Sequence, residues 1–115
     1  MSSGERGEPR RGEVWRAAFD PSLGGEIRKP RPATVVSNDA ANRLLNRTQV
    51  VPITSKVERL YRAEASLTVG RARRKAMADK LTTASRQRLR GRLAKLDPKD
   101  LAGVQRAIKP QLGLT

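Results

Sequence analysis

Short runs of apolar and β-branched residues, separated by Gly, Pro, Asn and Asp, recur along most of the chain. The clearest alternation covers residues 61–67, where Tyr61, Ala63, Ala65 and Leu67 share one face and polar side chains occupy the other. A period of two with one apolar face is typical of a half-buried antiparallel strand. Shorter runs predict strands over residues 13–19, 33–37 and 49–53, and weaker patterns cover residues 76–81 and 89–96.

Three segments carry helical patterns. Asn38 and Asp39 are capping residue types that predict a short helical turn, and residues 83–88 predict a second short helical piece. The longest helix is predicted to begin after Asp97, which can accept bonds from free amides and is followed by Pro98 at the first helical position. Pro110 should kink or end this helix near its last turn. Its apolar stripe consists of Leu101, Val104, Ile108 and Leu112.

The order of these elements predicts the fold. A chain of 115 residues is long enough for one domain with a modest core. Several short strands followed by one packing helix indicate a small antiparallel barrel or rolled sheet, so the fold class is mainly β, or α+β if the helices are counted. Residues 1–11 are rich in Gly, Ser, Glu and Arg and predict a disordered lead-in, which leaves residues 12–115 as the folded domain.

The charge balance is strongly basic. Lys and Arg number 25 against 11 acidic residues, and the formal net charge is +14. Residues 71–95 contain ten of these cations and a single acid, Asp79. Such charge indicates a polyanionic partner, nucleic acid before a membrane surface, although a charge run is often only a solvated face. The N-terminal residues contain no apolar signal-peptide core, so we expect a cytoplasmic protein.

Missing residue types narrow the chemistry further. The chain has no Cys, which excludes disulfides, thiol nucleophiles and zinc ribbons, and no His, the usual general base. Any catalysis must therefore use Arg, Lys, Asp, Glu, Ser, Thr or Tyr61. The aromatic residues are Trp15, Phe19 and Tyr61, too few for a sheet that stacks RNA bases on many aromatic rings. We expect Trp15 to lie in the core.

The resemblance to a known family rests on several motifs in a fixed order. These are RRGEVWRAAFDPSLGGE at residues 10–26, KPRPATVVSNDAAN at 29–42, VVPITS at 50–55, YRAEASL at 61–67, MADKL at 77–81 and the closing LGL. In this order the motifs resemble the MazF/PemK family of toxin endoribonucleases. Any one of them alone is a weak signal, whereas the ordered set covers nearly everything after residue 10.

The resemblance implies an SH3-like barrel with a C-terminal helix, usually a homodimer, that cuts single-stranded RNA without a metal or cofactor. The cut leaves a 2′,3′-cyclic phosphate and a 5′-hydroxyl. The family's functional arginine corresponds to Arg31, its threonine to Thr54 and an acid of its first loop to Glu26. The resemblance also implies an antitoxin partner encoded nearby. Because a basic groove favours an acidic extended segment, we expect that antitoxin to carry an acidic tail.

The candidate residues suit this chemistry. A fixed guanidinium such as Arg31 can pair with two oxygens of a phosphate that gains charge, and the Thr54 hydroxyl can donate to the phosphate or to the leaving 5′-oxygen. The general base stays open between Glu26 and Arg31. In the ordinary alternative Arg31 only pairs with Glu26 on the surface and Thr54 is a plain strand residue. The cations expected to contact RNA are Arg28, Lys29, Arg71, Arg73, Arg74, Lys75 and Lys80.

Two departures from the family pattern limit what the resemblance implies. The usual Asp-Gln pair is here Asp79-Lys80, and a basic stretch precedes it, so sequence preference does not carry over from relatives. Two other functions compete with RNA cleavage: a noncatalytic nucleic-acid-binding barrel and a CcdB-like poison of DNA gyrase. The presence of both Arg31 and Thr54 argues against the gyrase poison, which has no need of this pair. The noncatalytic barrel is favoured by the charge alone.

Overall fold

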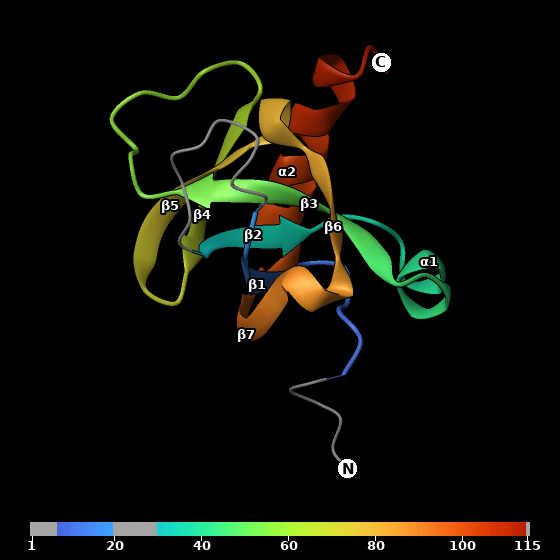
Figure 1. The fold of residues 1–115 in the computed structure, drawn as a ribbon. Helices are drawn as coiled ribbons and strands as arrows, with labels where there is room; N and C mark the ends of the chain where they lie inside the picture. The colour runs from blue at the N-terminus through green and yellow to red at the C-terminus, as the bar shows by residue number, and fades with distance from the viewer. Residues whose placement is uncertain (1–6, 20–29, 115) are drawn as a thin grey trace.

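The computed structural model describes residues 7–19 and 30–114, which form a curled antiparallel sheet with one long helix across a face (Figure 1). This arrangement confirms the mainly β fold class. The helices are α1 (Asp39–Leu44) and α2 (Pro98–Gln111), with short 3-10 helices at Ala78–Lys80 and Arg86–Arg88. The strands are β1 (Glu13–Ala17), β2 (Arg31–Val35), β3 (Arg47–Thr54), β4 (Glu64–Val69), β5 (Ala72–Met77), β6 (Thr82–Ser85) and β7 (Leu89–Lys95).

Strand β3 is the centre of the sheet. The strand order is β4-β5-β3-β2-β1-β7, and β6 pairs with β3 outside this path. One edge of β3 is shared by two partners, because Val50 pairs with Thr82 of β6 whereas Ile53 pairs with Ala76 of β5. The other edge pairs with β2. Strand β3 therefore joins the β4–β5 pair to the rest of the sheet, which contains β1, β2, β6 and β7.

The apolar core has two parts on opposite faces of the sheet. Neighbouring residues of a strand point to opposite faces, and accordingly Val51 packs in one cluster and Val50 in the other. The first cluster lies between the sheet and α2 and includes Ile53, Leu67 and Val104. The second is built around Trp15, Ala33, Val35 and Leu89. Trp15 is only 4% exposed, which confirms the prediction that it belongs to the core.

Helix α2 follows its sequence pattern closely. The Asp97 carboxylate accepts a hydrogen bond from the Asp100 amide at 2.9 Å, as expected of an N-cap. Pro110 lies in the last turn and the helix ends at Gln111, while the predicted stripe residue Leu112 lies beyond it and is exposed. Within the described residues, no helix is both long enough and apolar enough to cross a membrane.

Three of the predicted segments differ most from the structure. The alternating segment at residues 61–67 becomes a strand only from Glu64 onward, because the Tyr61 amide donates to the Glu64 carboxylate at 2.8 Å and forms a turn. The strand expected at residues 76–81 is instead β5, which ends at Met77 and gives way to a 3-10 helix. Residues 83–88, expected to be helical, form most of β6 and a 3-10 helix, because β6 pairs with β3.

The start of the folded domain also differs from the prediction. Pro9 is buried, the Arg10 amide donates to the Glu13 carboxylate at 2.9 Å, and the Arg11 amide donates to Asp39 at 2.7 Å. These contacts attach residues 9–11 to β1 and α1. The residues just before position 12 are therefore part of the packed domain. The α1 prediction is confirmed, since Asn38 caps that helix by accepting from the Ala41 amide.

Candidate active site

Arg31 and Thr54 lie at the same end of the sheet. Strand β2 begins at Arg31 and β3 ends at Thr54, and because the two strands are antiparallel the start of one lies beside the tip of the other (Figure 1). The register pairs Ala33 with Pro52. Continuing that register by two residues on each strand brings Arg31 across from Thr54. Alternation along each strand places both side chains on the face opposite α2.

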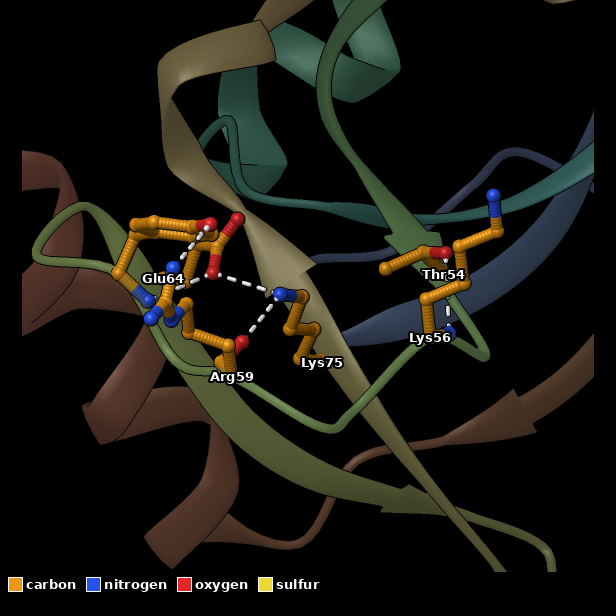
Figure 2. A network of polar contacts seen from close by, with 6 residues as sticks. Thr54, Lys56, Arg59, Glu64 and Lys75 are labelled. Atoms are coloured by element: carbon orange, nitrogen blue, oxygen red, sulfur yellow. Dashed lines mark hydrogen bonds and ion pairs between the residues drawn. The ribbon is translucent and has the colours of Figure 1, made fainter.

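Among the residues that the structure describes, the Thr54 hydroxyl makes one hydrogen bond. Its Oγ1 accepts from the Lys56 amide at 3.2 Å, a bond within the turn that follows β3 (Figure 2). A hydroxyl that accepts this bond still has its proton to donate. The turn therefore holds the oxygen in place and leaves its donor available to a bound group.

The Arg31 side chain is exposed at the first position of β2, opposite Ala17 of β1. Within the described part of the chain no carboxylate lies at ion-pairing distance from its guanidinium. An exposed guanidinium on a paired strand can meet a phosphate with two parallel N–H groups. The predicted base Glu26 and the predicted RNA-contacting cations Arg28 and Lys29 lie outside the described residues.

A buried ion pair adjoins Thr54 on its other side. Lys75 of β5 is the strand partner of Thr54, and it is only 6% exposed. Its ammonium group lies 2.8 Å from the Glu64 carboxylate and donates to the Arg59 carbonyl at 2.5 Å (Figure 2). The Glu64 carboxylate also accepts from the Tyr61 amide. The ion pair thus attaches the loop of residues 55–63, which begins at the end of β3, to strands β4 and β5.

The ionisation of Glu64 reflects this environment. Burial raises the pKa of its carboxyl. The pKa is lowered by more than this through the hydrogen bonds that the carboxylate accepts from Lys75 and from the Tyr61 backbone amide, and through the positive charges of Lys75 and Lys80. The net effect places the pKa of Glu64 below its ordinary value of 4.5. Glu64 is therefore ionised at neutral pH and remains the partner of the Lys75 ammonium.

The remaining predicted cations occupy different environments. Arg71, Arg73 and Lys80 are exposed, as expected for residues that contact a polyanion, and Arg74 is half-buried with its guanidinium on the Arg73 carbonyl. Lys75 differs from the prediction: its ammonium is buried against Glu64 and is not part of the exposed surface. The charge run concealed this difference, because residue types along β5 do not show that Lys75 has a carboxylate partner on β4.

Sequence reasoning missed the contribution of Glu64, Arg59 and Tyr61 to this end of the sheet. One signal was available: Glu64 is the single acid of the alternating segment at residues 61–67. That segment is followed by a basic strand, with which it forms a hairpin, so an ion pair between the two strands could have been expected. The loop contacts of Arg59 and Tyr61 have no periodic pattern.

Among the residues that the structure describes, no group of three or more Asp or Glu side chains gathers in a way that could hold a metal ion.

Known proteins are similar to this chain in fold and in sequence over nearly its whole length. Residues 10–112 match the family model described as PemK-like, MazF-like toxin of type II toxin-antitoxin systems. The chain is 35% identical over 114 residues to Endoribonuclease MazF9 of Mycobacterium tuberculosis, which covers 91% of this chain and 97% of that protein. The resemblance found in the ordered motifs is confirmed by this match.

Solved structures agree with the sequence comparisons. A crystal structure of MazF from Deinococcus radiodurans superposes with a TM-score of 0.79 at 29% identity and covers 93% of this chain and 98% of that one. An endoribonuclease in complex with its cognate antitoxin, from a mycobacterial species, superposes with a TM-score of 0.75 at 25% identity and covers 93% and 97%. With its fold, its motif order and these matches, the chain belongs to the PemK-like, MazF-like toxins of type II toxin–antitoxin systems.

Proposed function

We propose that this toxin is an endoribonuclease that cuts single-stranded RNA in a sequence-selective manner, without a metal ion, and leaves a 2′,3′-cyclic phosphate and a 5′-hydroxyl. The observation that carries the proposal is the antiparallel β2–β3 pair, in which β2 begins at Arg31 and β3 ends at Thr54 at the same end of the sheet. The family and the endoribonuclease MazF9, 35% identical to this chain, support the assignment of RNA as the substrate.

The chemistry assigns one role to each residue. The 2′-hydroxyl gives its proton to a base and its oxygen attacks the neighbouring phosphorus. The bond from phosphorus to the 5′-oxygen breaks, and the 5′-oxygen takes up a proton from water to become the 5′-hydroxyl. Arg31 binds two non-bridging oxygens as their negative charge grows, which stabilises the transition state more than the ground state. The Thr54 hydroxyl donates to the phosphate or to the departing oxygen. The base that removes the 2′-proton is Glu26 or Arg31 itself.

The basic surface and the partner follow from the same proposal. Arg71, Arg73 and Lys80 are exposed and supply salt-sensitive contacts to the RNA backbone. The toxin acts as a homodimer, and an antitoxin with an acidic tail occupies the RNA-binding groove and competes with RNA. A solved relative in complex with its cognate antitoxin supports the existence of such a partner. Charge attraction should speed the encounter at low salt.

The test is cleavage of a mixed RNA pool in EDTA, followed by mapping of both fragment ends. We expect cleavage at a limited set of sequences with cyclic phosphate and 5′-hydroxyl ends. Cleavage that requires added magnesium, or fragments with 5′-phosphate ends, would contradict the mechanism. A parallel assay of DNA gyrase supercoiling tests the competing function of a gyrase poison, and we expect no inhibition there.

A further inference from the structure

One aromatic side chain of this protein faces solvent in the loop that follows Thr54. Trp15 is 4% exposed and Phe19 packs against the core, whereas Tyr61 is 56% exposed. The alternating pattern placed Tyr61 on the apolar face of a half-buried strand, so its exposure is not explained by packing. It belongs to the loop of residues 55–63, whose first turn contains the hydrogen bond to the Thr54 hydroxyl.

The Tyr61 ring is fixed although it is exposed. Its backbone amide donates to the Glu64 carboxylate at 2.8 Å. The Lys75 ammonium lies 5.3 Å from the ring centre and the Arg59 guanidinium 5.6 Å from it, both within the range of cation–π attraction. Arg59 also donates to the Tyr61 hydroxyl at 3.4 Å. Lys75 in turn is held by the buried ion pair with Glu64, so the orientation of the ring depends on the β4–β5 hairpin.

These features match what a nucleotide requires. An exposed aromatic face can stack with any unpaired base, and a ring that is already fixed loses little conformational entropy on stacking. The Arg59 guanidinium beside the ring provides positive charge for the phosphate of the same nucleotide. The loop also contains exposed Lys56 and Arg62 against one acid, Glu58, so its charge favours a polyanion.

We infer that Tyr61 is a stacking platform for one unpaired base of the RNA, close to the phosphate bound by Arg31 and Thr54. The inference rests on the proposed ribonuclease function and adds a base-binding position to it. Two structural connections link Tyr61 to Thr54. Lys75, which contacts the ring, is the strand partner of Thr54, and the loop itself begins at Thr54. RNA that passes over the end of β3 therefore meets the ring within the same binding surface.

The experiment measures binding and does not depend on cleavage. Short RNA strands with 2′-O-methyl groups at every position lack the attacking hydroxyl, and each strand of the series carries one abasic position. Fluorescence anisotropy gives the affinity of the wild-type protein for each strand. Loss of the stacked base should weaken binding about 5- to 150-fold at one position, the range typical of base–aromatic stacking.

Variants of the loop assign that effect to Tyr61. Tyr61→Leu should bind the intact strand more weakly and show no further loss at the abasic position, whereas Tyr61→Phe should keep the wild-type profile because it keeps the ring. Leu60→Ala, at an exposed apolar position of the same loop, is the matched control and should also keep the profile. Near-ultraviolet circular dichroism verifies that each variant is folded.

Two results would overturn the inference. The first is an unchanged abasic profile in Tyr61→Leu. The second is a change of oligomeric state of Tyr61→Leu in sedimentation with the abasic profile intact, which would assign the ring to a protein interface. Failure of the wild-type protein to cut ordinary RNA would contradict the proposed function alone, because the stacking measurement uses strands that this chemistry cannot cut.

Discussion

Lys75 lies directly across from Thr54 in the β3–β5 pair, yet its ammonium group is directed to the Glu64 carboxylate 2.8 Å away. The neighbour of the candidate catalytic hydroxyl is thus a buried ion pair and not a free cation. Because the same carboxylate accepts from the Tyr61 amide, the pair also holds the loop after Thr54. Polar contacts, namely this ion pair and the hydrogen bond to Glu64, therefore hold the loop at this end of the sheet. Two predictions follow from the ion pair.

Removing the buried cation should destabilise the fold. Lys75→Met leaves the Glu64 carboxylate buried without its partner, and breaking such a pair from one side costs about 3–5 kcal/mol. Urea denaturation at pH 7 measures the loss in the free energy of unfolding. The matched control is Arg73→Met, an exposed cation two positions earlier on the same face of β5, which should change stability by no more than about 0.5 kcal/mol. Equal effects of the two variants would show that the ion pair does not matter for stability.

The ion pair should also give the stability a characteristic pH dependence. The folded protein holds the pKa of Glu64 below its ordinary value of 4.5, so the stabilisation is fully present above about pH 4.5 and is lost as the pH falls through the folded pKa. Glu64→Gln should therefore lie furthest below the wild type in free energy of unfolding near pH 7 and approach it toward pH 3. Glu58→Gln, at an exposed position of the loop, serves as the control. A gap between wild type and Glu64→Gln that stays constant with pH would refute this assignment.

The exposed cations of the β5 region should set the salt dependence of RNA binding. Replacing Arg71, Arg73 and Lys80 by Gln should flatten the log–log plot of affinity against salt by up to about 0.7 per lost phosphate contact on a single strand. The control is the matched replacement of three exposed cations on α2, which packs on the opposite face of the sheet: Lys99, Arg106 and Lys109. If both triple variants flatten the slope equally, the charge acts through the whole protein and not through one surface.

The sequence predicted the parts of this fold that have a strong local signal. The caps at Asn38 and Asp97 are set by side-chain oxygens a few residues from the amides they bind, so residue types alone indicated where both helices start. The strand at β5 was placed too late, because three consecutive cations conceal an alternation that tertiary pairing enforces. Tyr61 was placed on the apolar face of a strand because its position fitted a period of two, and a turn closed by Glu64 removed it from the strand.

The positions of the two candidate residues could also be predicted in part, because the motifs that contain them are local in the sequence. The ordered motifs indicated Arg31 and Thr54, and the β2–β3 register places them at one end of the sheet. No sequence pattern indicated that Lys75 is buried, because the partner that neutralises it comes from a different strand. Long-range contacts of single polar side chains leave no periodic trace in the sequence.

In the proposed mechanism, Arg31 and Thr54 act together on one phosphate. We would measure single-turnover cleavage rates in EDTA, at saturating protein, for the wild type, Arg31→Ala, Thr54→Val and the double variant. Removal of Arg31 should slow cleavage about 10²–10³-fold while circular dichroism shows an unchanged fold, by analogy with the loss of one oxyanion donor. Because groups that act as a unit are not additive, the double variant should be little slower than the slower single variant. Wild-type rates in Arg31→Ala or Thr54→Val would contradict the account.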